Sequence, residues 1–149
     1  VRQDFSLHCY RMKFTAIHPQ LLPHVWTHVA PLLDKAISLT PKLIDLETVY
    51  KGALADVYVV WAAIDDETNE FVGAVTTRIV KYPKSDALAM DFLGGTRMKE
   101  WLHLAQEAVE EHANRNNCKY LEAYGRKAWS RYLEPFGWDQ AYTTYKKEL

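Results

Sequence analysis

The chain has 149 residues, the size of one ordinary domain, and its 48% hydrophobic and 25% charged residues are typical of a globular protein. A formal net charge of −1 excludes the broad positive field that a protein needs to bind duplex nucleic acid as its main role. No apolar run approaches the ~20 residues of a membrane-spanning helix, and the spacing of cysteines and histidines suggests no metal site. We therefore expect one cytoplasmic domain over residues 1–149, with no membrane segment and no metal.

The first third of the sequence predicts one strand and two helices. Residues 6–14 alternate roughly and predict an edge strand. From Pro19 to Leu39 apolar residues recur every three or four positions, as on an amphipathic helix, and Pro31 predicts a kink or a break in it. Thr40–Pro41 is a cap residue followed by proline, which predicts the start of a second helix that ends near Gly52.

The middle of the chain is rich in β-branched and aromatic residues and predicts antiparallel strands. Val57–Ile64 and Phe71–Tyr82 are expected to pair as a hairpin around the polar turn Asp65–Glu70. Ala87–Leu93 predicts a further strand, and the glycines of Gly94–Arg97 are expected to break it.

The last third begins with the clearest helix of the sequence, Met98–Asn116, which has an apolar face and an acidic face. A short strand is expected at Cys118–Tyr124, a short helix at Arg126–Leu133 and a closing strand at Gln140–Lys147. A strand–helix–strand unit beside antiparallel hairpins predicts a mixed α/β fold, in which a central, mostly antiparallel sheet carries helices on both faces.

This order of elements resembles the GNAT superfamily of acyl-CoA N-acyltransferases over residues 57–149. Three features carry the resemblance: Gly73 in the strand after the polar turn, the break at Gly94–Gly95 before the long helix, and the aromatic residues around glycine in Phe136–Trp138. Within the superfamily, the sequence looks most like uncharacterised GNAT-like proteins of phages and prophages.

The resemblance implies a GNAT-like fold, acetyl-CoA as co-substrate and a small-molecule or peptide amine as acceptor. It also implies a homodimer, located in the cytoplasm, or in the host cytoplasm or virion for a phage-encoded protein. Such enzymes let the amine attack the thioester directly, so that they need mainly positioning and removal of a proton.

Two departures from the family pattern leave a second function open. The acyl-CoA loop of the family usually reads Gln/Arg-x-x-Gly-x-Gly/Ala, whereas the stretch Leu93–Trp101 has its glycines displaced toward the strand. Many members also place a catalytic tyrosine four residues before the last Gly-aromatic pair, where this chain has Leu133. The alternative is therefore a non-catalytic GNAT-fold protein that binds CoA or is associated with a virion.

The turn before the long helix is the expected acyl-CoA site. A glycine pair lets backbone N–H groups approach a phosphate, the following helix presents its positive end, and an arginine can add a bidentate contact. The alternative is a turn that needs glycine dihedral angles and nothing more. With the region that flanks the pantetheine arm in the family, the expected cofactor-binding residues are Leu93, Gly94, Gly95, Thr96, Arg97 and Arg126.

Four residues are catalytic candidates. Asp91 and Glu122 are alternative acceptors for the proton of the amine. Tyr124 and Tyr132 are candidate general acids for the departing thiolate, because the ordinary pKa of tyrosine, about 10, lies near that of a thiol. The competing interpretation makes Asp91 a solvent-side residue or a partner of Arg78, and makes Tyr132 a packing residue.

Overall fold

A computed structural model describes residues 11–40, 44–125 and 127–149 of the chain. The elements are β1 (Met12–Ile17), α2 (Leu22–Ser38), α3 (Leu46–Leu54), β2 (Val59–Asp65), β3 (Phe71–Lys81), β4 (Asp86–Gly95), α4 (Met98–Arg115), β5 (Tyr120–Ala123) and α5 (Ser130–Leu133), the last flanked by the 3₁₀ turns η1 (Lys127–Trp129) and η2 (Glu134–Phe136).

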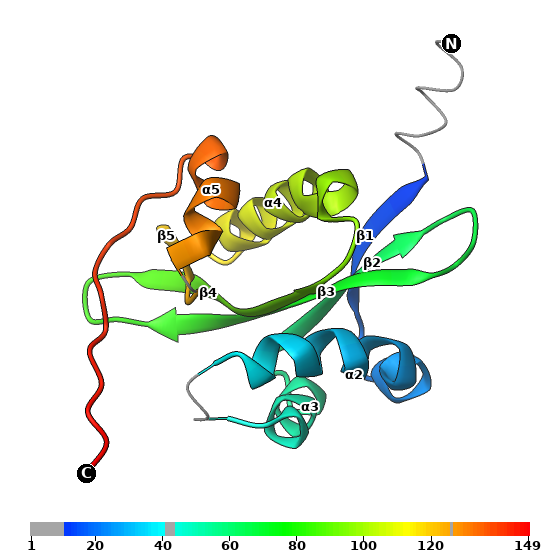
Figure 1. Ribbon diagram of the computed structural model, residues 1–149, viewed down its shortest axis with the longest axis horizontal. Coiled ribbons are helices and arrows are strands. Elements are labelled where there is room, and N and C mark those ends of the chain that lie inside the picture. The colour runs from blue at the N-terminus through cyan, green and yellow to red at the C-terminus, as the bar shows by residue number, and fades with distance from the viewer. Residues whose placement is uncertain (1–10, 41–43, 126) are drawn as a thin grey trace.

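The five strands form one sheet in the order β1-β2-β3-β4-β5. The first three pairs are antiparallel, and β4 and β5 are parallel because α4 connects them. Figure 1 shows α2 and α3 on one face of the sheet and α4 and α5 on the other. The predicted mixed, mostly antiparallel α/β architecture is confirmed.

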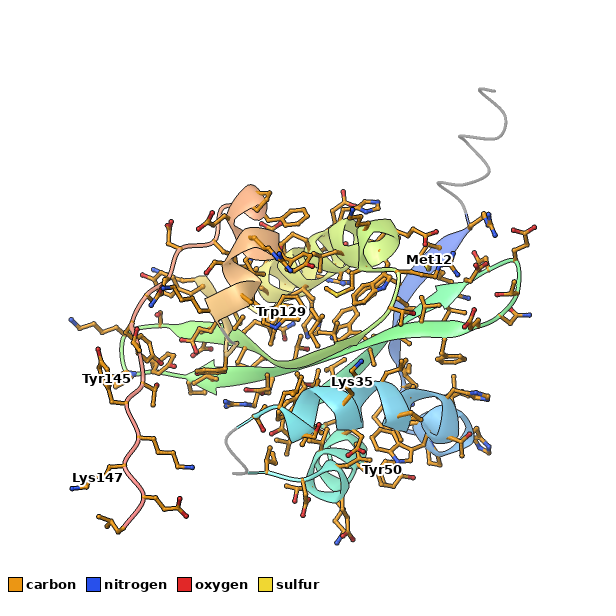
Figure 2. The ribbon with its side chains drawn as sticks, in the orientation of Figure 1. Met12, Lys35, Tyr50, Trp129, Tyr145 and Lys147 are labelled. Carbon is orange, nitrogen blue, oxygen red and sulfur yellow. The ribbon has the colours of Figure 1, made fainter. Side chains whose placement is uncertain are left out.

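Strand alternation builds a separate core on each face, and Figure 2 shows side chains on both sides of the sheet. In β2, Trp61 and Ala63 face α4, while Val60 and Ala62 face α2 and α3. Because both faces are covered, this interior strand is apolar on both sides and shows no simple alternation of polar and apolar residues in the sequence.

The α4 register depends on Trp101, whose side chain is fully buried. Its indole ring lies over Gly73 of β3, and a Cβ at that position would overlap the ring. Its Nε1 donates a hydrogen bond of 2.8 Å to the carbonyl oxygen of Thr96. Ala105 and Val109 are buried on the same face, as predicted, whereas Leu102 is only half-buried.

Several predicted boundaries in the N-terminal half are wrong. The helix α2 continues unbroken through Pro31. The next helix begins at Leu46 and not at residue 41. The Asp45 side chain caps it by accepting a 2.8 Å hydrogen bond from the Thr48 backbone N–H. Residues 41–43 lie outside the described part. The first strand covers Met12–Ile17, and residues 6–10 are also outside that part.

Two boundaries in the C-terminal half also differ. β4 continues through Gly94 and Gly95, where the sequence predicts a break. The predicted closing strand at Gln140–Lys147 does not form: residues 137–149 contain neither helix nor strand, and Figure 1 shows them running past the β3–β4 hairpin. High β propensity gives a strand only where a neighbouring backbone is positioned to pair with it.

The described residues contain no helix long and apolar enough to cross a membrane. Nor do they contain a group of three or more His, Cys, Asp or Glu side chains arranged to hold a metal ion.

Candidate functional site

The parallel strands β4 and β5 separate part of the way along β4, at the β5 edge of the sheet. They pair from Ala87↔Tyr120 to Met90↔Ala123, where β5 ends, while β4 continues to Gly95. From Asp91 onward, the edge of β4 that faces β5 is therefore no longer paired with it. Unpaired backbone N–H and C=O groups at such an opening need other partners, such as a ligand or water.

Asp91 lies at this opening as the extra residue of a β-bulge. Met90 pairs with Thr77 and Phe92 pairs with Thr76, so Asp91 has no partner residue on β3. Bulges of this kind re-aim a side chain. Here the sequence pattern of β4 gives no sign of the bulge, because it depends on the register with β3.

The Asp91 carboxylate forms a bidentate pair with Arg78. The Nε of Arg78 donates to Oδ2 at 2.6 Å, and its NH2 donates to Oδ1 at 3.2 Å. The hydrogen bond to Asp91 raises the pKa of Arg78. Burial, and then the charge of Asp91, raises the pKa of Tyr58. From the sequence, Asp91 is expected to be a proton acceptor, a solvent-side residue or a partner of Arg78. The structure shows it as a partner of Arg78.

Glu122 lies on β5 between two tyrosines. Leu121 packs against the α4-side core, so alternation directs Glu122 to the face that carries α2 and α3. Its Oε2 accepts hydrogen bonds from the hydroxyls of Tyr82 at 3.0 Å and Tyr124 at 2.9 Å. Glu122, Tyr82 and Tyr124 thus form a hydrogen-bonded cluster. Its residues come from β5, from the position just after it and from the end of the β3–β4 hairpin.

Both tyrosine hydroxyls hold their protons more tightly than an isolated phenol. Burial, followed by the hydrogen bond to Glu122, raises the pKa of Tyr124 above its ordinary value. The hydrogen bond to Glu122 also raises the pKa of Tyr82. Both groups are therefore neutral hydrogen-bond donors at neutral pH, and Tyr124 is a weaker acid than free tyrosine. No local pattern in the sequence marks Tyr82 as a site residue. Its proximity to β5 follows from the pairing of Lys81 with Asp86 and of Ala87 with Tyr120.

The structure separates Tyr132 from the other catalytic candidates. It lies on α5, on the α4 side of the sheet (Figure 1). Its ring contacts Trp129, with 5.4 Å between ring centroids, and its hydroxyl accepts a 3.4 Å hydrogen bond from Arg131. Asp91, Glu122 and Tyr124 thus share one face, and Tyr132 belongs to the other. Arg126, an expected cofactor-binding residue, lies outside the described part of the chain.

Each glycine of the turn before α4 has a packing role. A Cβ on Gly94 would overlap the carbonyl oxygen of Leu32 in α2, so only glycine lets this helix approach β4 so closely. Gly95 has a φ of 141°, and a Cβ there would overlap the carbonyl oxygen of Val72. Thr96 then donates its backbone N–H to that same oxygen at 2.8 Å.

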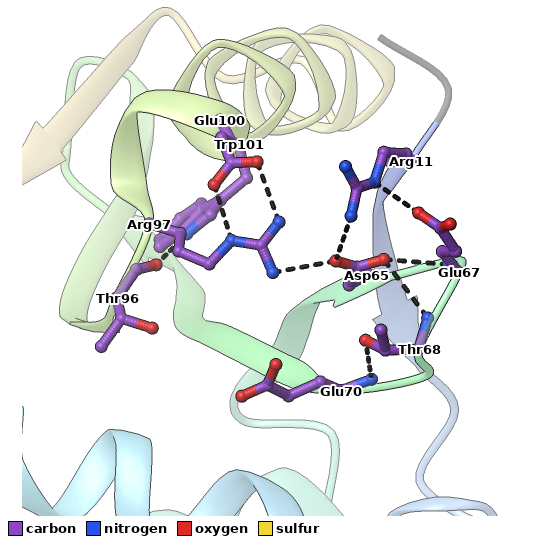
Figure 3. Close-up of polar contacts among 9 residues, drawn as sticks. All are labelled: Arg11, Asp65, Glu67, Thr68, Glu70, Thr96, Arg97, Glu100 and Trp101. Atoms are coloured by element: carbon purple, nitrogen blue, oxygen red, sulfur yellow. Dashed lines mark hydrogen bonds and ion pairs between the residues drawn. The ribbon is translucent and has the colours of Figure 1, made fainter. Parts of the chain in front are cut away.

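Arg97 precedes α4 in the left-handed conformation, with a φ of 54°, and its guanidinium is held by two carboxylates (Figure 3). Its Nε and NH2 donate to Glu100 at 2.6 and 2.8 Å, and its NH1 donates to Asp65 at 2.8 Å. These bonds, those to Glu100 first, raise the pKa of Arg97. The positive charge that the sequence assigns to a phosphate is thus already balanced within the protein.

Asp65, the last residue of β2, lies at the same end of the sheet as this turn and connects it to the turn between β2 and β3. The sequence predicts an exposed turn residue, but its side chain is only 2% exposed and accepts hydrogen bonds from Arg97 and from the backbone of Glu67 and Thr68 (Figure 3). Arg11 adds a longer ion pair at 4.0 Å. No local pattern in the sequence marks this network, because its members lie on β2, before β1 and before α4.

The Asp65 network predicts a specific acid sensitivity. The hydrogen bond from Arg97 holds the pKa of Asp65 below its ordinary value of 3.8. Because the folded-state pKa is lowered, the ionised side chain stabilises the fold fully above about pH 5 and loses this contribution as the pH falls through the folded-state pKa. We expect Asp65→Asn to lower the melting temperature at pH 7 by roughly 5 °C and to reduce the further fall between pH 5 and pH 2.

The measurement is thermal unfolding by circular dichroism across this pH range. Asp66→Asn changes the neighbouring residue, whose side chain is 48% exposed, and is the matched control. In this variant the melting temperature should fall between pH 5 and pH 2 as steeply as in the wild type. An Asp65→Asn protein whose melting temperature falls as steeply with acid as that of the wild type would contradict the assignment.

Comparison with known proteins places this geometry in context. No protein-family model matches the chain, and no curated protein matches its sequence. Among solved structures, it is similar to an aminoglycoside acetyltransferase from an uncultured soil metagenomic sample, with a TM-score of 0.65 and 13% identity over 93% of this chain and 97% of the other. It is also similar to the ribosomal-protein-alanine N-acetyltransferase of Brucella melitensis biovar Abortus 2308, with a TM-score of 0.68 and 17% identity over 93% and 99%.

A third similar structure is glucosamine-6-phosphate N-acetyltransferase from Arabidopsis thaliana, with a TM-score of 0.66 and 11% identity over 92% of this chain and 97% of the other. At such identities the likeness establishes the fold. The expected GNAT-type acetyltransferase fold is confirmed, and it extends beyond residues 57–149 to more than nine-tenths of the chain.

Proposed function

We propose that this GNAT-fold chain is an acyl-CoA-dependent N-acyltransferase that transfers an acetyl group from acetyl-CoA to a small-molecule or peptide amine. The observation that carries the proposal is the opening between β4 and β5, with Asp91 on one strand, and Glu122 and Tyr124 on or just after the other. The opening leaves the β5-facing backbone of β4 beyond Met90 without a strand partner, and the side chains supply groups that take up or donate a proton.

The chemistry requires the acceptor amine to lose a proton before it attacks the thioester carbonyl. Both oxygens of Asp91 already accept hydrogen bonds from Arg78. Glu122 uses only Oε2 for its two tyrosine partners, and no other hydrogen bond to its carboxylate is found among the described residues. Glu122 is therefore the better of the two proton acceptors, with Asp91 as a positioning residue. Tyr124 remains the candidate general acid on this face.

The proposed acyl-CoA site is the turn from Leu93 to Arg97. The first backbone N–H groups of α4 have no partner within the helix and point out of its amino end, where a phosphate would be stabilised. Arg97 could contribute only by sharing or releasing Glu100. The participation of Arg126 remains a prediction.

One observation favours the second candidate, a non-catalytic CoA-binding or virion-associated module. The Arg97 guanidinium is paired with two carboxylates, which reduces its attraction for a phosphate. The phage origin, the homodimer and the cytoplasmic or virion location that the resemblance implies stay predictions.

The proposal is tested by titrating acetyl-CoA in a calorimeter and then measuring thiol release with a panel of amines. We expect micromolar to millimolar binding and thiol release that depends on the amine. Glu122→Gln should bind acetyl-CoA within about twofold of wild type but lower kcat about 100-fold or more, the scale of a lost general base.

Glu110→Gln, on the exposed face of α4, is the control and should keep wild-type turnover. A flat titration with folded protein would refute both acyl transfer and CoA binding. Binding without thiol release for any amine would favour the CoA-binding module.

A further inference from the structure

A cavity of about 240 Å³ is bounded by strands β2, β3 and β4 and by the C-terminal part of α4. Its apolar lining consists of Val57 just before β2, Val59 at its start, Ile79 of β3 and Leu88 of β4, and His112 lines it from α4. Val59 and Leu88 belong to the α4-side core. The volume is below the ~300–1,000 Å³ of sites for drug-sized molecules, so the cavity fits a molecule with a single ring or a short branched chain.

The cavity is separate from the proposed reaction site. Leu88 pairs with Leu121, where β4 and β5 are still joined, so the cavity lies beside the closed part of the sheet. It opens on the α4 side, whereas Glu122 faces the side of α2 and α3. Along α4, His112 is about 20 Å from the turn at Arg97.

Three polar side chains line the cavity with unused hydrogen-bonding capacity. Among the described residues, nothing donates to the Asp56 carboxylate or bonds to either ring nitrogen of His112, whose ring meets Trp61 edge-on at 5.4 Å between centroids. Thr77 is fully buried, and its Oγ1 accepts a 2.9 Å hydrogen bond from Trp61 Nε1. Burial, followed by the charge of Arg115, lowers the pKa of His112, so the ring is neutral at neutral pH and one nitrogen accepts a hydrogen bond.

The charges around the cavity favour a cationic ligand. Arg78 also lines it, but its guanidinium is paired with Asp91 at 2.6 Å. Arg115 lies 3.9 Å from Glu111. In the described part of the chain, no cation forms an ion pair with Asp56, so this carboxylate is the uncompensated charge of the lining. A carboxylate and a neutral ring nitrogen both accept hydrogen bonds, which an ammonium group donates, and the apolar lining suits a hydrocarbon body.

We propose that this cavity binds a small hydrophobic primary amine in its ammonium form, with the charged group toward Asp56 and His112 and the apolar body against Val59 and Leu88. The ligand is held there and not acylated, because the cavity lies on the other side of the sheet from Glu122 and far from the acyl-CoA turn. This binding site goes beyond the proposed acyl transfer and does not depend on it.

The first test titrates the protein, without acetyl-CoA, with three probes that share a phenyl ring and a short chain. These are 2-phenylethylamine, 2-phenylethanol and 3-phenylpropanoate, which are positively charged, uncharged and negatively charged. We expect the amine to bind at least tenfold more tightly than the alcohol, the scale of one charge pair at a partly screened distance, and the anion to bind most weakly. Equal affinities for the amine and the alcohol, or no saturable binding of the amine, would overturn the inference.

The position of the bound amine is measured by ¹H–¹⁵N NMR during the same titration. The largest amide shifts should fall on residues that line the cavity, such as Thr77, Ile79 and Leu88. Shifts confined to the surroundings of Glu122 would place the amine at the reaction site and contradict this proposal. Val57→Trp, at a position that is 57% exposed, should weaken amine binding at least tenfold by covering the cavity and leave the acetyl-CoA titration as in the wild type. Unchanged amine binding in this variant would also contradict it.

Asp56→Asn tests the charge without changing the backbone. Asp56 has a φ of 61°, in the left-handed region that asparagine also tolerates. The ratio of affinities for the amine and the alcohol should shrink to within about threefold. Asp66→Asn, which neutralises another exposed carboxylate, should keep the wild-type ratio. A ratio unchanged in Asp56→Asn would remove the role of this carboxylate. Amine binding at the cavity in a protein that transfers no acetyl group would keep this site and remove the proposed function.

Discussion

Replacement of Trp101 by alanine is expected to lower the free energy of unfolding by about 3–5 kcal/mol, as for other large aromatic side chains removed from a core. The side chain is fully buried, and its ring covers Gly73. Phe14 stacks on it at 6.2 Å between ring centroids, and its indole N–H satisfies the Thr96 carbonyl oxygen at 2.8 Å. The change therefore leaves a cavity and an unpaired carbonyl together.

Urea unfolding followed by circular dichroism measures this effect. Trp129→Ala is the matched control, because Trp129 lies in the 3₁₀ turn η1, outside both buried cores, and should cost less than half as much. Comparable losses in the two variants would contradict the central role of the contact between Trp101 and β3.

Gly95→Ala is expected to destabilise the fold by about 2–5 kcal/mol, because two costs combine. The φ of 141° at this residue lies in a region that side chains with a Cβ rarely adopt. A Cβ would also overlap the Val72 carbonyl oxygen, which the Thr96 backbone N–H holds in place at 2.8 Å. To remove this overlap, β3 and β4 would have to move apart just before α4 begins.

Gly137→Ala isolates the backbone cost. Gly137 also has a positive φ, 86°, but nothing lies within 4 Å of the Cβ that alanine would add. We expect a loss of only about 1 kcal/mol there. If chemical denaturation gives equal losses for the two glycine variants, the close approach of β3 and β4 at Gly95 has no energetic consequence.

Sequence alone determined the elements whose signals are local. The apolar period of α4 correctly predicts its start at Met98 and the burial of Trp101, because one helical face repeats every three to four residues. The β-branched segments correctly predict β2, β3 and most of β4. The glycine-marked order of these elements was sufficient to anticipate the acetyltransferase fold.

Tertiary structure alone decided the features that depend on register and on long-range contacts. Local composition makes Asp65 an exposed turn residue, yet Arg97, 32 residues later, hydrogen-bonds to it in a buried network. The close approach of α2 to Gly94 and the convergence of Tyr82 and Tyr124 on Glu122 likewise join segments far apart in the chain. At Gln140–Lys147 the local propensity is for a strand, but no sheet edge pairs with it. Periodicity reports which face of an element is buried, but only the assembled backbone determines which distant groups meet.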